Sequence, residues 1–266
     1  MRARLARIMQ NRDSYGPSQP SEDNSRIPRA REGRDQGESF ESNTHARRRD
    51  NFRTPEKGTW GGARNRRGRI TEALRQEHSE GIFRAIAIAE LKGMPLNRFW
   101  TVNYEWAGID DSEAAAFIGR LLAQCHRYAR ARGGVFAAVW VREIGATNGG
   151  HVHIALHFPA GWKLSGPKVR KWINAAGGEY SAKVSDMRPI GGRLDCARSN
   201  PGHYWANAEA MGNYMVKGSA DAVAVELGLV TRKPGGRIIG KRWGRTQNLW
   251  NSCSNFLTNN CDGATR

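Results

Sequence analysis

Residues 149–159 read GGHVHIALHFP, an alternation of polar and apolar side chains that is typical of a β-strand. Because successive side chains on a strand point to opposite faces, the three histidines of this run share one face with Ala155. The apolar residues between them point the other way, into a core. Two imidazoles at positions i and i+2, those of His151 and His153, can therefore bind a single metal ion.

This strand is predicted to be the second arm of a β-hairpin. Residues 135–143 form the first arm, and the turn-forming residues 146–150 return the chain into the second. Glu143 ends the first arm near the two histidines, so it could add a carboxylate to the same ion. Two imidazoles and one carboxylate with open coordination positions suit Mn²⁺ or Mg²⁺ that also binds phosphate oxygen, although the same set could hold other divalent metals.

The flanking segments predict the fold class. Aromatic and β-branched residues predict a strand over 98–105, and residues 180–187 could form another. Apolar residues at helical spacing predict a helix from residues 110–112 to about 132, and further helices over 167–176 and 200–219. Residues 70–91 also have helical spacing, but Gly81 interrupts it, which predicts one or two short helices. This order favours an α+β domain with helices packed on a central, mostly antiparallel sheet of about five strands.

Composition divides the chain into three parts. Residues 1–69 contain 17 basic and 9 acidic residues and few apolar ones, which predicts a disordered basic arm. Residues 70–250 are expected to form the folded domain, and residues 251–266 a polar tail. The chain contains neither a transmembrane-length apolar run nor a signal peptide, so we expect a cytoplasmic protein without a membrane partner. The four cysteines lack metal-binding spacing and are expected to be free thiols.

The charge favours a polyanionic partner. The formal net charge is +17, and nine tryptophans offer surfaces on which bases can stack. Residues 235–245 read GGRIIGKRWGR, so Arg237, Lys241, Arg242 and Trp243 are candidate DNA contacts. A solvated loop with no ligand is the alternative for this segment.

Tyr214, on the predicted helix 200–219, is the candidate nucleophile. Lys217 follows three residues later on the same helical face, where its cation can neutralise a phosphate. Tyr204 on the same helix competes for the role, but no lysine follows it one turn later. A phenol with a pKa of about 10 is a poor nucleophile at neutral pH, so a metal ion and Lys217 would have to stabilise the phenolate. These residues predict metal-assisted phosphodiester cleavage through a tyrosyl intermediate.

Three segments, in this order, resemble the motifs of the HUH endonucleases: the strand FWTVN at 99–103, the pair His151-Val152-His153, and Tyr214-x-x-Lys217. The resemblance covers roughly residues 98–218 and is to the single-tyrosine rolling-circle replication initiators of bacterial plasmids and filamentous phages. It implies nicking and later joining of single-stranded DNA at a replication origin through a 5′-phosphotyrosine. Host helicase and polymerase are the partners such a role calls for, since the chain has no phosphate-loop motif of its own.

Two other interpretations stay open. A DNA-binding replication or regulatory protein would share the basic charge and the tryptophans, but its histidines would be structural and it would cut nothing. A relaxase or transposase would use the same chemistry on a different substrate. A covalent protein–DNA adduct distinguishes the first of these from an endonuclease.

Overall fold

A computed structural model describes residues 68–229, 233 and 235–250. Its centre is a five-stranded antiparallel sheet in the order β5-β2-β4-β3-β7. The strands are β2 (Arg98–Val102), β3 (Ala137–Gly145), β4 (Gly149–His157), β5 (Ser185–Pro189) and β7 (Trp243–Arg245). Beside it, β1 (Ile70–Thr71) and β6 (Ile238–Ile239) form a short two-stranded ribbon.

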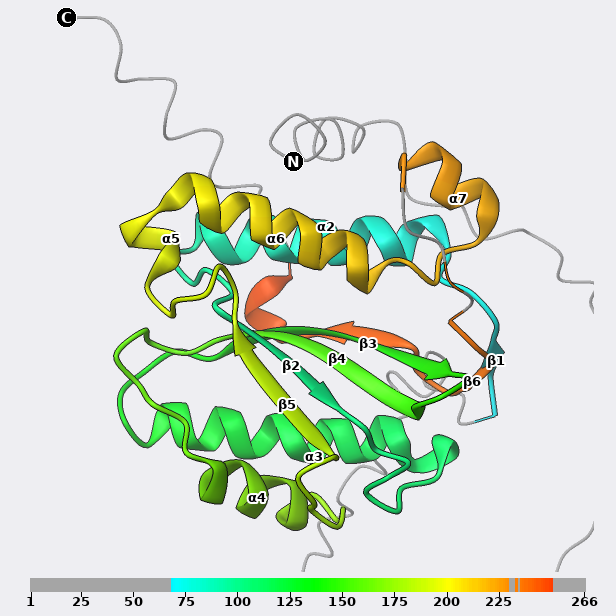
Figure 1. The fold of residues 1–266 in the computed structure, drawn as a ribbon, viewed down its shortest axis with the longest axis horizontal. Helices are drawn as coiled ribbons and strands as arrows, with labels where there is room; N and C mark the ends of the chain where they lie inside the picture. The colour runs from blue at the N-terminus through cyan, green and yellow to red at the C-terminus, as the bar shows by residue number, and fades with distance from the viewer. Residues whose placement is uncertain (1–67, 230–232, 234, 251–266) are drawn as a thin grey trace, which may run out of the picture.

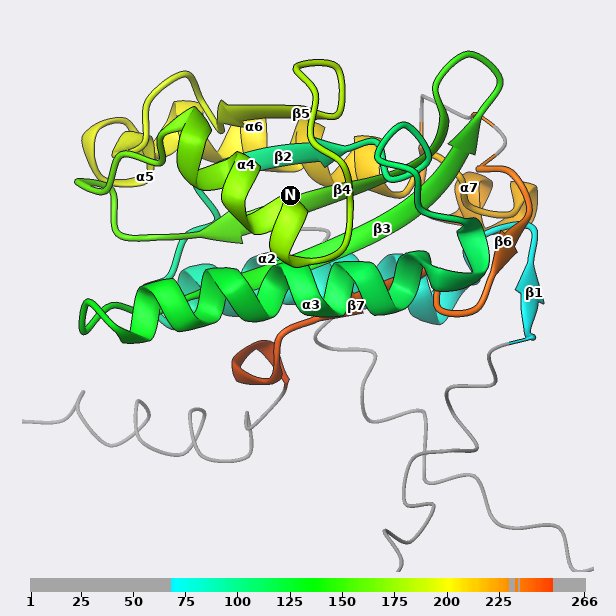
Figure 2. The same cartoon turned by 90° about the horizontal axis from the view of Figure 1, so that it is seen from below.

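Helices cover both faces of the sheet, which gives three layers (Figures 1 and 2). One face carries α2 (Gln76–Leu91) and α6 (Pro201–Met215), and the other carries α3 (Asp111–Arg130) and α4 (Gly166–Ala175). Short helices α5 (Cys196–Ser199), α7 (Asp221–Glu226) and η2 (Gln247–Leu249) complete the described part. The predicted α+β class with a five-stranded antiparallel sheet is confirmed.

The alternation along β4 divides the core in two. Val152, Ile154 and Leu156 pack with α3 and α4, whereas Ala155 packs with α2 and α6. The predicted hairpin is confirmed, and β3 pairs with β4 in a register that sets Glu143 opposite His151. His151 and His153, which share the face of Ala155, are buried.

Several boundaries differ from the sequence prediction. Helix α2 continues through Gly81 without a break. A glycine is required at this position because an added Cβ would lie 2.5 Å from the ring of Trp243. Strand β5 begins at Ser185 rather than at residue 180, and β2 ends at Val102 before a turn. The helix predicted after residue 110 is confirmed, and the Asp110 carboxylate accepts a hydrogen bond from the Ser112 amide as its N-cap.

The predicted arm up to residue 67 and the tail 251–266 lie outside the described residues, as do Cys253 and Cys261. Arg69, which we assigned to the arm, belongs to the described part, where its carbonyl accepts a hydrogen bond from the Gly240 amide. Cys125 and Cys196 are free and buried. Across residues 68–229 and 235–250, none of the helices has the length and apolar character needed to cross a membrane.

Candidate metal centre and its tyrosine

The β3–β4 hairpin brings three metal-ligand side chains together. Glu143 on β3 stands opposite His151 on β4, and His153 follows two residues later on the same face. Gly149 makes the reversal possible, because it adopts a φ of 59° that other residues rarely adopt. One ligand atom from each of the three side chains lies within 4.8 Å of the other two. All three residues are buried.

Hydrogen bonds to the far side of each imidazole orient the histidines. Nδ1 of His151 lies 2.9 Å from the Gly149 carbonyl oxygen, and Nδ1 of His153 lies 3.0 Å from Oγ1 of Thr101. The Nε2 atoms therefore face Glu143, at 3.7 Å and 3.6 Å from its Oε2. Outer hydrogen bonds of this kind fix the ring orientation of metal-binding histidines in proteins.

Two atoms of this cluster lack a partner. Among the described residues, Nε2 of His153 and Oε1 of Glu143 are buried and accept or donate no hydrogen bond. An unpaired buried polar atom costs about 1–3 kcal/mol, so native proteins rarely leave one without a reason. Both atoms are metal-ligand types and belong to one cluster. The buried set of Glu143, His151 and His153 could therefore hold a metal ion.

The electrostatics keep His153 and Glu143 in the protonation states that a metal ion needs. Burial lowers the pKa of His153 to about 4, against the raising effect of Glu143, so its imidazole is neutral at neutral pH. Burial alone would raise the pKa of Glu143, but the neighbouring imidazoles of His151 and His153 and the charge of Lys217 together hold it well below its usual range. The carboxylate is therefore ionised beside two imidazoles.

Lys217 joins the cluster from the end of α6. Its ammonium forms a buried ion pair with Oε2 of Glu143, where we had expected it to face a phosphate. The same ammonium lies 3.8 Å from the centre of the Tyr214 ring. Burial lowers the pKa of Lys217, and the Glu143 carboxylate opposes that shift. Lys217 thus connects the carboxylate of the cluster to the tyrosine.

Tyr214 lies at the mouth of the cluster. Its side chain is 42% exposed, and its ring packs edge-on against His153 with 4.9 Å between ring centres. Burial and the Glu143 charge raise its pKa, so the hydroxyl is protonated at neutral pH. Tyr204, the competing tyrosine, is only 1% exposed within the core between α2 and α6, and burial raises its pKa strongly. The structure brings Tyr214, and not Tyr204, to the cluster of Glu143, His151 and His153.

The residues predicted to contact DNA occupy different environments. Arg237 and Lys241 are exposed, whereas Trp243 is half-buried against α2. Arg242 is 2% exposed, and its guanidinium donates hydrogen bonds to Thr71 and to the carbonyl of Gly236. Arg242 therefore joins β1 to the residues that precede β6, and its buried guanidinium is not available to a DNA phosphate.

Sequence reasoning missed the residues that support His153. Phe99 on β2 stacks on the His153 ring at 5.4 Å, and Thr101 holds its Nδ1. Both residues lie in the FWTVN strand at 99–103, but their role depends on the pairing of β2 with β4, which sets Thr101 opposite His153. His157, which shares their strand face, lies apart from the cluster, with its Nδ1 at 2.8 Å from the Pro95 carbonyl oxygen.

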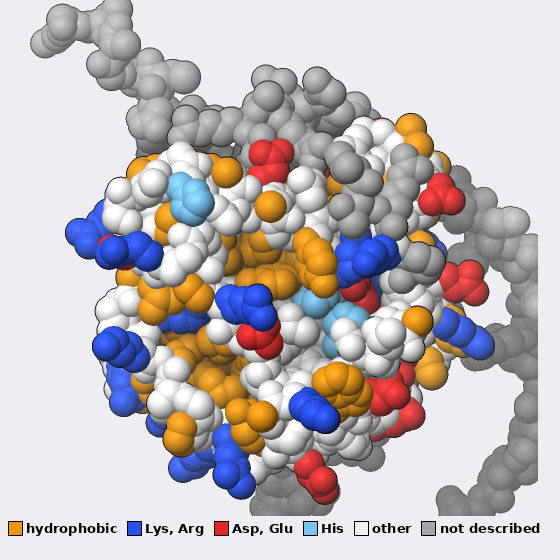
Figure 3. Space-filling view, in the orientation of Figure 1, with side chains coloured by type: hydrophobic (Ala, Val, Ile, Leu, Met, Phe, Trp, Pro, Cys, Tyr) orange, Lys and Arg blue, Asp and Glu red, His pale blue; other side chains and the backbone are white. Residues whose placement is uncertain are grey.

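Histidine side chains reach the surface near the centre of the face drawn in Figure 3, with acidic, basic and apolar side chains around them. His151 is 8% exposed, so the cluster is buried but close to solvent. Comparisons of the chain with protein-family models, with curated proteins and with solved structures find no match.

Proposed function

We propose that this protein is a metal-dependent endonuclease that nicks and rejoins single-stranded DNA through a covalent link to Tyr214. The observation that carries the proposal is the contact between the Tyr214 ring and His153, a member of the buried metal-ligand cluster. A half-exposed hydroxyl beside a metal-ligand set is what attack on a phosphodiester requires. Mn²⁺ or Mg²⁺ suits this nitrogen and oxygen ligand set, and when bound it would act as a Lewis acid on the scissile phosphate.

The cleavage reaction consumes no reactant other than the DNA strand and Tyr214. The Tyr214 oxygen forms a bond to phosphorus, and the bond from phosphorus to the 3′ oxygen of the preceding nucleotide breaks. The proton of the tyrosine hydroxyl is matched by the proton taken up by the released 3′-OH. Because the phosphotyrosine conserves the energy of the broken ester, the free 3′-OH can attack it and rejoin the strand.

Lys217 has two roles in this scheme. In the structure its ammonium pairs with Glu143 and lies over the Tyr214 ring. If the Glu143 carboxylate binds a divalent cation instead of Lys217, the Lys217 ammonium remains beside the tyrosine and can stabilise the developing phenolate. This matters because the pKa of Tyr214 is raised, which makes the hydroxyl harder to ionise.

A purely DNA-binding protein is the second candidate, and the same basic charge favours it. It gives no reason for a buried carboxylate and imidazole with unpaired atoms, which reduce stability unless they are used. Initiation of rolling-circle replication is the setting that the sequence motifs favour. A relaxase or transposase would share the residues and the chemistry.

The test is covalent capture. The full chain is incubated with a pool of labelled single-stranded oligonucleotides in Mn²⁺ or in EDTA, and adducts are separated on a denaturing gel. We expect an adduct in Mn²⁺ that is absent in EDTA and absent for Tyr214→Phe. Oligonucleotide binding by Tyr214→Phe should stay nearly unchanged, because only the hydroxyl is removed.

Two matched controls replace other tyrosines by phenylalanine. Tyr204→Phe alters the same helix within the core, and Tyr180→Phe alters a tyrosine that is only partly buried. Both should form the adduct as the wild type does. An adduct that persists in Tyr214→Phe, or that forms equally in EDTA, would contradict the proposal, and absence of any adduct would favour the DNA-binding alternative.

A further inference from the structure

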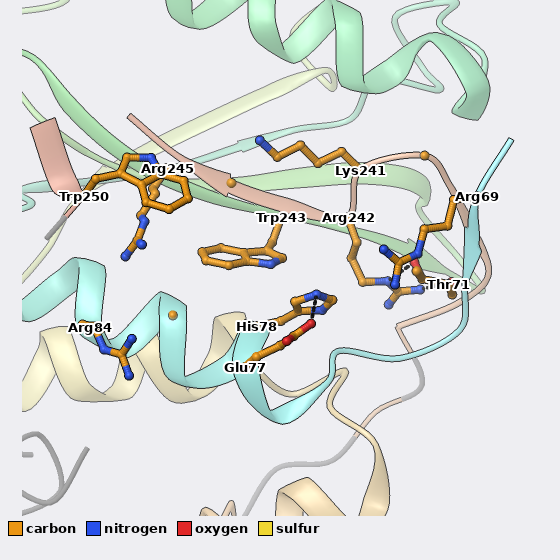
Figure 4. A pocket seen from close by; sticks show the side chains of 13 residues that line it. Arg69, Thr71, Glu77, His78, Arg84, Lys241, Arg242, Trp243, Arg245 and Trp250 are labelled. Carbon is orange, nitrogen blue, oxygen red and sulfur yellow. Dashed lines mark hydrogen bonds and ion pairs between the residues drawn. The ribbon is translucent and has the colours of Figure 1, made fainter. Parts of the chain in front are cut away.

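A cavity lies on the other side of α2 from Tyr214. It has a volume of about 550 Å³ and is bounded by α2, β7 and the residues around β1 (Figure 4). Phe83 of α2 packs against Gly212 of α6, while Gly81 of the same helix meets Trp243 of β7. Helix α2 therefore separates this cavity from the metal centre, and a ligand in it would not occupy the catalytic cluster.

The lining combines cations with aromatic rings. Arg69, Arg84, Lys241 and Arg245 bring positive charge, against the single carboxylate of Glu77 among the lining residues. Trp243 and Trp250 bring indole rings, and Trp250 is 57% exposed. An exposed tryptophan beside arginines is the combination with which proteins bind the bases and phosphates of single strands.

Arg245 is held in place but lacks partners. Its guanidinium carbon lies 4.3 Å from the centre of the Trp250 ring and 5.9 Å from that of Trp243. Within the part of the chain that the structure describes, its Nε and Nη1 are buried and donate no hydrogen bond. Guanidinium donors are strong and always charged, so leaving two of them buried and unused is unfavourable.

Arg84 lies close to these unused donors. Figure 4 shows the Arg245 guanidinium between the Trp250 ring and Arg84 of α2. The charge of Arg84 and, more strongly, burial lower the pKa of Arg245. Among the described residues, Arg84 forms an ion pair with Glu80 at 3.8 Å and Arg245 forms none, which leaves the pair of arginines short of negative charge. An anion beside the two guanidinium groups would neutralise their repulsion.

We propose that this cavity is a nucleotide-binding site, in which a phosphate contacts Arg245 and Arg84 and the attached base stacks on Trp250. The volume is in the range of small-ligand sites and suits one nucleotide. On the sheet, Trp243 pairs with Val141, which pairs with His153, so ordinary strand spacing puts about 10 Å between Trp243 and His153. The site is thus near the metal centre but does not depend on cleavage.

Calorimetric titration of the full chain in EDTA tests this site, because no cleavage occurs without metal. The ligands are dAMP, deoxyadenosine, inorganic phosphate and a short oligodeoxyadenylate. We expect saturable binding of dAMP, with deoxyadenosine and phosphate each at least about tenfold weaker, since each lacks one of the two contacts. If the oligonucleotide binds with equal or higher affinity than dAMP, the ligand of the cavity is a nucleotide within a DNA strand. If dAMP binds more tightly, the ligand is a free nucleotide.

Variants distinguish dAMP binding in this cavity from non-specific binding to the rest of the surface. Trp250→Ala, Arg84→Gln and Arg245→Met should each weaken dAMP binding at least about fivefold, whereas Trp106→Ala and Arg188→Gln, at exposed residues elsewhere, should not change it. Trp250→Ala and Arg84→Gln alter partly exposed side chains, so they test the site even if Arg245→Met does not fold. Tyr214→Phe should bind dAMP normally.

The proposal is overturned if the wild type shows no saturable dAMP binding, if phosphate binds as well as dAMP, or if the Trp250 and Arg84 variants bind as the wild type does. None of these results bears on adduct formation at Tyr214, so the two proposals can fail separately.

Discussion

The two faces of β4 show how one strand serves stability and chemistry at once. On one face Val152, Ile154 and Leu156 are fully buried among the apolar residues of the α3 and α4 layer. On the other face His151 and His153 are buried beside Glu143, and within the described residues Nε2 of His153 and Oε1 of Glu143 lack hydrogen-bond partners. The first face is packed as a core should be, and the second holds a set of side chains that could bind a metal ion. Each face can therefore be altered without the other.

The largest effect on stability is expected on the apolar face. Ile154→Ala should lower the free energy of unfolding by about 2–5 kcal/mol, because it removes buried methyl groups and leaves a cavity. Mn²⁺ affinity of the folded protein should be retained, since Ile154 points away from the cluster. Denaturant unfolding measures the first quantity and calorimetry the second.

The matched change on the opposite face is His153→Ala. It should abolish Mn²⁺ binding and lower stability less than Ile154→Ala does, because it also removes an unpaired buried nitrogen. Equal losses of stability in the two variants, or Mn²⁺ binding lost in Ile154→Ala alone, would show that the faces are not independent.

The histidine face should also make the metal-free protein sensitive to acid. The folded-state pKa of His153 is about 4, below the ordinary value of 6.5. Between these pH values the unfolded chain binds a proton that the folded chain does not, so stability rises with pH by about 1.4 kcal/mol per unit. The free energy of unfolding in EDTA should therefore fall by about 3 kcal/mol from pH 6.5 to 4.

His153→Gln is the control for this pH dependence, because glutamine does not titrate. The variant should lose most of the decrease between pH 6.5 and 4, and any decrease that remains belongs to other groups. An unchanged pH profile in His153→Gln would mean that His153 is not held neutral by burial.

Much of this arrangement could be predicted from local sequence. The period-two alternation in residues 149–157 indicated β4, and the turn before it indicated the hairpin that brings Glu143 to the histidines. The helix carrying Tyr214 was predicted over residues 200–219, and the structure has it as α6, which ends at Met215, so Lys217 lies just beyond it. Local patterns report backbone period and turn chemistry, and these elements depend on little else.

What could not be predicted depends on contacts between distant segments. Lys217 pairs with Glu143 across 74 residues, and Arg242 is buried through hydrogen bonds to Thr71 across 171 residues. From the sequence alone we predicted that Lys217 neutralises a phosphate and that Arg242 contacts DNA. Gly81 looked like a helix breaker because the approach of Trp243 is invisible in the sequence. Tertiary packing overrode the local expectation at each of these positions.

The smallest expected effect tests the support of His153 from the neighbouring strand. Thr101→Val keeps the side-chain shape but removes the hydroxyl that lies 3.0 Å from Nδ1. Mn²⁺ affinity should fall about tenfold, which is typical of losing an outer hydrogen bond to a metal-binding histidine. Thr71→Val, at the end of β1, also removes a hydroxyl that accepts a hydrogen bond, from Arg242, and is the control that should leave Mn²⁺ affinity unchanged. An unaltered affinity in Thr101→Val would remove Thr101 from the site.

The most direct test of the central claim is a calorimetric titration of the full chain with Mn²⁺ at neutral pH. We predict one binding event per chain that is lost in His151→Ala, His153→Ala and Glu143→Gln and kept in Tyr214→Phe, because the tyrosine lies beside the cluster but is not a member of it. If the wild type does not bind Mn²⁺, or if the three ligand variants bind it as the wild type does, then Glu143, His151 and His153 are not a metal centre and the account of Tyr214 is wrong.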